Sequence, residues 1–241
     1  MIPEGTRGQG FKIVKMIYLL IILVVAMVIY GPHLWARYIM NRYNQREYFS
    51  GNGRELARLV LDGMDLKNVT VEQTEIGDHY NPVTKVVRLT DANCGRRTLT
   101  AVVVAAHEVG HAIQDHTEYL PLKTRTRMIG TAAKIEKIGA ALMMAVPVIA
   151  VVTRVPAAGF LMFLSGVATL CIPLLVHLVT LPTEIDASFN RALPLLASGK
   201  YIPEEDLPAA KKILLACALT YVANALVGLL NVWRWIRILR R

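Results

Sequence analysis

Apolar stretches alternate with polar segments along this chain. A mixed polar region at Pro32–Lys137 follows one apolar stretch, Ile13–Gly31, and precedes three others at Ile138–Thr153, Ala157–Leu181 and Ile213–Val232. A helix needs about 20 apolar residues to cross a bilayer. The pattern therefore predicts four transmembrane helices, one before the polar region and three after it.

The segments that flank the apolar stretches refine this prediction. Basic residues precede the first stretch, as in a signal peptide, but no small-x-small cleavage site follows it, so we expect an uncleaved anchor helix. The second and third stretches are separated only by Arg154–Pro156, which predicts a hairpin with a tight turn. The tail Trp233–Arg241 combines tryptophans with arginines and predicts an anchor at the membrane interface.

The polar region has the pattern of a small α+β domain. Arg54–Met64 carries apolar residues at helical spacing, and Gly63 is a plausible stop. Val69–Ile76 and Lys85–Leu89 predict two short strands joined by a turn-rich segment. Thr98–Asp115 predicts a helix whose apolar part is too short to span a membrane. This helix should belong to a folded domain that lies against the bilayer.

Composition agrees with a membrane location. Hydrophobic residues make up 54% of the 241 residues, more than the 45–50% usual in soluble domains. The net charge of +9 could indicate nucleic acid, but no nucleic-acid-binding motif is present, so anionic lipid headgroups are the simpler partner. Cys94, Cys171 and Cys217 are widely spaced and predict packing residues rather than a disulfide or metal framework.

A His-Glu-x-x-His motif lies on the predicted helix Thr98–Asp115. His107 and His111 are four residues apart, so both imidazoles face the same way and can hold one zinc ion. Glu108 is placed to take a proton from a water that the metal activates. Gly110 is costly in a helix, and a close approach of backbone or substrate would explain it. The alternative is a chance match with ordinary polar histidines.

A catalytic zinc needs a third protein ligand, and Glu184 is the candidate. The predicted hairpin returns the chain to the side that it left, so Glu184 should emerge beside His107. The alternative is an acidic residue at the N-terminus of a helix that begins at Pro182 and Thr183. Asp186 is a candidate partner for a ligating histidine, although it could equally face solvent.

Other polar residues remain open candidates. His79 and Tyr80 could donate hydrogen bonds to a transition state, or could simply belong to a turn. His177 lies within the third apolar stretch, where a neutral, hydrogen-bonded histidine is the favoured interpretation. His116 is expected to face solvent. Lys85–Leu89 could be an edge strand that pairs with an extended substrate.

The motifs resemble a known family. Asp78-His79-Tyr80-Asn81-Pro82, the Ala105–Gln114 segment and Pro182–Leu193 are similar to neutral zinc metallopeptidases of the YugP type. This resemblance covers nearly the whole chain and implies zinc, peptidase activity and a bacterial membrane. A more distant similarity is to HtpX-type membrane peptidases, although Ser188 stands where that family has an aspartate.

These observations predict a mainly α membrane protein with four transmembrane helices and a small α+β zincin-like, gluzincin-like metallopeptidase domain. Its expected parts are an N-terminal segment with the first span (1–31), a membrane-adjacent catalytic region (32–137), a transmembrane hairpin (138–181), a third-ligand helix and linker (182–212), and a fourth span with a basic tail (213–241).

The predicted function is zinc-dependent hydrolysis of peptide bonds, with Glu108 as general base and His107, His111 and Glu184 as metal ligands. Protein or peptide substrates and membrane lipids are the expected partners, nucleic acid is not, and a homo-oligomer or a membrane-protein partner stays open. Lysines and arginines only slightly favour a cytosolic site. The alternatives are intramembrane proteolysis and a catalytically silent, zinc-stabilised scaffold that regulates partner membrane proteins.

Overall fold

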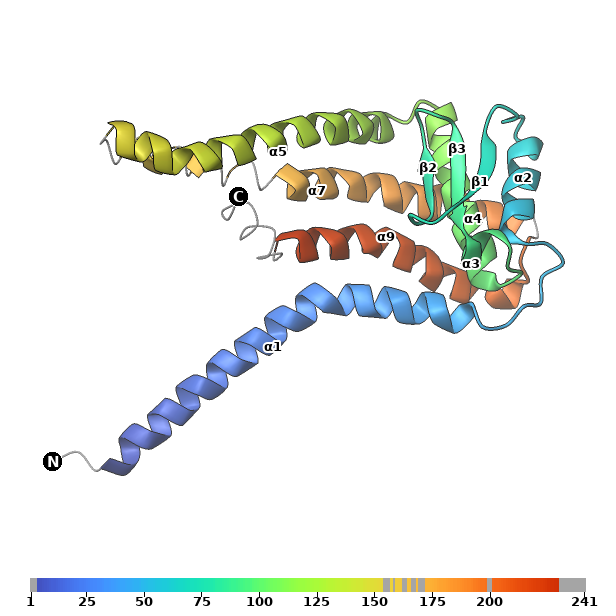
Figure 1. The fold of residues 1–241 in the computed structure, drawn as a ribbon. Helices are drawn as coiled ribbons and strands as arrows, with labels where there is room; N and C mark the ends of the chain where they lie inside the picture. The colour runs from blue at the N-terminus through green and yellow to red at the C-terminus, as the bar shows by residue number, and fades with distance from the viewer. Residues whose placement is uncertain are drawn as a thin grey trace.

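Four helices, which we call the long helices, lie side by side in this computed structural model, except at the N-terminal half of the first, which turns away from the others (Figure 1). It describes residues 4–153, 172–198 and 201–229, together with a few positions between 157 and 168. Within these residues α1 is Glu4–Tyr43, α5 is Leu120–Thr153, α7 is Ile172–Ile185 and α9 is Leu207–Leu229. Neighbouring helices are in contact in the order α5, α7, α9, α1, so the helices form one layer.

Each of these helices contains all or part of one predicted apolar stretch. α1 and α5 are longer than predicted, because both continue into the polar region. In the part of the chain that the structure describes, Lys15–Tyr43 is the one segment long and apolar enough to cross a membrane. The predicted Arg154–Pro156 turn and Trp233–Arg241 tail lie outside the described residues.

A small sheet packs at one end of the helices (Figure 1). Its strands are β1 (Thr70–Thr74), β2 (His79–Asn81) and β3 (Val86–Thr90), in the order β1-β3-β2. β3 pairs parallel with β1 and antiparallel with β2. The predicted strand Lys85–Leu89 is confirmed as β3, but its predicted position at the edge of the sheet is wrong, because β3 is central. The segment predicted as a turn contains β2, which is too short to show alternation.

The two helices that pack near the sheet each begin after a residue that caps the helix with its side chain. α2 (Gly53–Gly63) starts with a capping box, in which Asn52 and Glu55 each accept a hydrogen bond from the other's backbone N–H. It ends at Gly63, as predicted. A four-residue helix, α3 (Asp91–Cys94), connects β3 to the segment before α4. The buried face of α2 packs against α4 (Leu99–His116), which begins after Thr98 caps it through its side chain.

The chain does not break after α7. It continues through a π-helix, η1 (Asp186–Ala192), into α8 (Leu193–Ser198), and then reaches α9 through a short 3-10 turn, η2 (Glu204–Asp206). The backbone N–H of Leu193 bonds to Ser188 O, five residues earlier, as a π-helix requires. Glu184 therefore lies in the last turn of α7, and the alternative of a new helix beginning at Pro182 and Thr183 is wrong.

α4 occupies the centre of this end of the molecule and crosses the ends of the long helices (Figure 1). Every residue from Leu99 to Gln114 is buried, which explains why the segment is apolar on all sides. α4 contacts α2 and the sheet on one side, and η1 and α9 on the other. His116, beyond the buried part, is exposed as predicted.

Gly110 allows the backbone of η1 to approach α4 closely. A Cβ atom built on Gly110 would lie 2.7 Å from the carbonyl oxygen of Ala187. Because that neighbour is a backbone atom, it cannot move without shifting η1. Close packing of the η1 backbone therefore explains why a glycine stands in this helix despite its cost. The sequence had suggested a close approach of either backbone or substrate.

Gly110→Ala should separate α4 from η1 and lower the midpoint of thermal unfolding of the detergent-purified chain, with a loss of about 1–3 kcal/mol from overpacking. Gly130→Ala is the matched control, since a Cβ on Gly130 in α5 meets nothing within 4 Å. The control should keep or slightly raise the midpoint, because alanine favours helices. Equal midpoints for the two variants would contradict the close approach.

Candidate metal centre

Three side chains from distant parts of the chain meet at the junction of α4 and α7. Nε2 of His107 and Nε2 of His111 each lie 3.2 Å from Oε2 of Glu184. The three residues are buried, and each offers one ligand atom within 4.8 Å of the others. The structure thus brings together the three residues predicted from the sequence as metal ligands.

A glutamine fixes the orientation of the His111 ring. The Gln114 amide nitrogen donates to Thr183 O and to Asp186 Oδ2, at 2.8 Å each. Its Oε1 is therefore the acceptor that faces His111 Nδ1, at 2.9 Å. Nδ1 of His111 therefore carries a proton, and in the neutral ring Nε2 presents a lone pair toward Glu184.

A serine has the same role at His107. The hydroxyl of Ser188 in η1 donates to Leu214 O in α9, at 3.2 Å. Because a hydroxyl has only one proton, its oxygen accepts from His107 Nδ1, at 3.1 Å. Nε2 of His107 then also presents a lone pair to Glu184. Ser188 thus contacts His107, one of the predicted metal ligands.

These contacts fit a zinc ion. In the neutral state that metal binding requires, two histidines of this tautomer direct lone pairs at a carboxylate oxygen, an arrangement that is repulsive unless positive charge lies between them. Donors that are each about 2.1 Å from one tetrahedral zinc lie about 3.4 Å apart. The two observed nitrogen–oxygen separations of 3.2 Å are close to that spacing. The residue types and the two nitrogen–oxygen distances therefore suit zinc.

Glu184 is held as an anion. Burial opposes its ionisation, but His111 and His107 lower the pKa of this carboxyl well below its usual range. A metal cation at the same place acts in the same direction. Nη1 of Arg125 donates to Oε1 of Glu184 at 2.9 Å, so the carboxylate oxygen that faces away from the histidines is also bound.

Glu108 lies beside the three ligands and is not one of them. Its side chain is buried, and burial raises the pKa of this carboxyl to about 7. A positive charge on His107, present only when that ring is protonated, would oppose this rise, and the charge of Glu184 adds to it. A carboxyl with such a pKa can both take and return a proton near neutral pH.

Asp186 contacts the site indirectly, through Gln114. The sequence made it a candidate partner for a ligating histidine, but its Oδ2 accepts from Gln114, which in turn binds His111. Asn190 and Arg191 also donate to Asp186. Burial disfavours the charged carboxylate, yet these three hydrogen bonds lower the pKa of Asp186. The sequence argument did not identify Gln114, Ser188 or Arg125 as part of the site.

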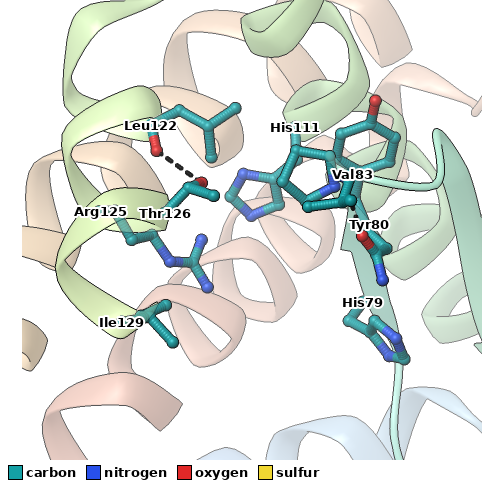
Figure 2. A pocket seen from close by; sticks show the side chains of 10 residues that line it. His79, Tyr80, Val83, His111, Leu122, Arg125, Thr126 and Ile129 are labelled. Carbon is teal, nitrogen blue, oxygen red and sulfur yellow. Dashed lines mark hydrogen bonds between the residues drawn. The ribbon is translucent and has the colours of Figure 1, made fainter. Parts of the chain in front are cut away.

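His79 and Tyr80 lie on β2 and line a cavity that adjoins His111 (Figure 2). The Tyr80 hydroxyl donates to Asp115 Oδ2 at 2.6 Å, and His79 Nδ1 donates to Gly77 O at 2.8 Å. In this structure the hydroxyl of Tyr80 is therefore engaged with α4, and transition-state donation by either residue stays a prediction. The side chain of His177 lies outside the described residues.

Comparisons with known proteins agree with this chemistry. The sequence profile of a family described as "Putative neutral zinc metallopeptidase" matches residues 17–240. A curated relative from Bacillus subtilis (strain 168), named "Putative membrane protease YugP", is 32% identical over 215 residues, which cover 86% of this chain and 92% of the relative. No solved structure matches significantly. The similarity to HtpX-type peptidases stays a prediction.

Ser188→Ala should weaken zinc binding about 10-fold to 100-fold, because loss of the partner of a ligating histidine releases its ring. The measurement is zinc affinity of the purified full chain in competition with a chelator. Ser198→Ala is the matched control, since Ser198 is exposed and its hydroxyl donates to Pro194 O within its own helix. Wild-type zinc affinity in Ser188→Ala would show that this hydrogen bond does not orient His107.

Proposed function

The chain belongs to the family of neutral zinc metallopeptidases, and from this premise we propose that it is a membrane-embedded zinc endopeptidase with Glu108 as its general base. One observation carries the proposal. His107, His111 and Glu184 converge in a buried site beside a carboxyl group, Glu108, that has no place among the ligands. Peptide bonds of proteins are the substrate class that the family implies.

In the proposed reaction, the metal ligands and Glu108 have separate roles. Zinc, when bound by His107, His111 and Glu184, supplies a Lewis acid that polarises the scissile carbonyl and makes a water more acidic. Glu108 takes the proton of the attacking water and then delivers it to the nitrogen of the leaving amine. The pKa of about 7 for the Glu108 carboxyl suits both transfers.

The scaffold alternative is less well supported. A structural zinc site is closed by four protein ligands, whereas a catalytic site keeps one position for water. Among the described residues, the metal cluster has three members. A scaffold would also have no use for a buried carboxyl one residue from a ligand, where burial disfavours its charged form.

We further propose that α1, the two helices of the hairpin and α9 all cross the membrane, with α4 at the interface. Exposed apolar side chains cover α1 from Met16 to Val25. Such a surface is suited to lipid rather than to water. α4 crosses the ends of the long helices (Figure 1), so the site would lie beside the membrane surface and not at the bilayer centre.

Glu108→Gln should reduce cleavage of an unfolded fluorescent protein by about 100-fold to 10,000-fold, since a glutamine cannot accept the proton, while zinc content is unchanged. Glu75→Gln is the control, because Glu75 is exposed at the end of β1. Undiminished cleavage by Glu108→Gln would mean a contaminant or a different site. Full zinc content without any cleavage by the wild-type chain would favour the scaffold.

The four-span topology can be tested by labelling single cysteines in intact cells or vesicles. In a cysteine-free background, Gly5→Cys and Arg154→Cys should react from one side of the membrane, and Glu118→Cys from the other, because an odd number of predicted spans separates Glu118 from each. Labelling of all three positions from the same side would contradict the proposed topology.

A further inference from the structure

The cavity beside His111 has a volume of about 360 Å³. α5 forms one wall with Leu122, Arg125, Thr126 and Ile129, and the segment from His79 to Val83 forms the other (Figure 2). Ligand pockets in proteins range from about 300 to 1,000 Å³. This cavity is at the small end of that range, which suits one side chain rather than a folded partner.

Several of the polar groups that line the cavity already have partners within the protein. Thr126 donates to Leu122 O at 2.9 Å, and the Tyr80 hydroxyl donates to Asp115. Oδ1 of Asn81 accepts from the backbone of Val83 and Thr84 in the turn after β2. A polar side chain that entered would therefore lose hydration without gaining these groups as partners, and would bind poorly.

Charge in the cavity is balanced as well. Arg125 is the basic residue of the lining, and its guanidinium group is paired with Glu184. An acidic side chain that bound to Arg125 would compete with this ion pair and lie close to the Glu184 carboxylate. The cavity thus disfavours acidic occupants although a cation lines it.

Apolar side chains flank the cavity without being covered. Val83, on the turn after β2, is 79% exposed, and Ile129, on α5, is 48% exposed. Pro82, which is half-buried, continues the apolar surface inside the lining. An apolar occupant would remove this surface from water, which is the favourable term that a polar occupant lacks.

We propose that this cavity binds a large apolar side chain, such as leucine, methionine or phenylalanine, of the substrate residue next to the bond that is cut. The cavity adjoins His111, so a residue held there lies beside the metal ligands. The inference rests on the proposed function, and it makes Ile129 and Val83 specificity-determining residues.

The test uses three short peptides that end in a hydroxamate, a group that binds zinc, and that differ only in a leucine, glycine or glutamate side chain beside it. Affinity for the zinc-loaded full chain should be at least about 10-fold higher for leucine than for glycine. Ile129→Arg should weaken the leucine peptide at least about 10-fold and bind the glutamate peptide more tightly than wild type does.

Ile76→Arg adds the same charge on the turn after β1, where Ile76 is 84% exposed and does not line the cavity. It should leave all three affinities unchanged. Val83→Arg on the opposite wall should give the same result as Ile129→Arg. Agreement between the two variants shows that the effect does not come from one variant that fails to fold. Equal affinities for leucine and glycine, unchanged selectivity in both arginine variants, or no binding of any peptide would overturn the inference.

Cleavage assays with the same protein separate this inference from the proposed function. An apolar preference in binding without cleavage of any protein would support the cavity and overturn the peptidase proposal. Cleavage of unfolded protein by the wild type, together with equal binding of the leucine and glycine peptides, would support the peptidase and overturn the cavity.

Discussion

The close contact between α4 and the junction of α7 with η1 is the constraint on which the site depends. His107 and His111 are brought to one side of α4 by helical periodicity alone. Glu184 joins them only because the backbone of η1 approaches α4 over Gly110, where any larger residue would meet Ala187 O. A single backbone contact therefore determines whether two ordinary histidines become part of a three-ligand site.

The buried polar groups around this contact stabilise it because nearly every one of them has a partner. Gln114 joins α4 to Thr183 at the end of α7 and to Asp186 in η1, Ser188 joins η1 to both His107 and Leu214, and Arg125 joins α5 to Glu184. A buried polar network of this kind favours one arrangement of its helices, since any shift leaves groups unpaired at a cost of about 1–3 kcal/mol each. The same bonds set the tautomers of the two histidines, so fold stability and metal affinity rest on the same groups.

Sequence could predict those features of the site that depend on local periodicity or on chain topology. The His-Glu-x-x-His helix follows from spacing, and Glu184 from the requirement that a hairpin return to its starting side. Gln114 and Ser188 were missed because their roles depend on the rotation of one helix against another, which no local pattern records.

The interpretation of Glu184 as a helix N-terminal residue was wrong because Pro182 suggested a boundary, whereas the backbone continues through α7 into a π-helix. β2 was missed because three residues are too few to show alternation, and its presence moved Lys85–Leu89 from the edge of the sheet to its centre.

The small α+β region does not form a core of its own. Its buried residues continue into those of the long helices, with Ala36 and Ile39 of α1 and Ile213 and Leu214 of α9 in the same cluster as Val103 of α4. A region of about a hundred residues buries limited apolar surface by itself, and shared packing compensates for this. Ser188 bonds to the carbonyl of Leu214, so a displacement of α9 would reach His107 through one hydrogen bond. The packing that completes the domain thus also connects the residues predicted as metal ligands to α9, one of the helices that we propose cross the membrane.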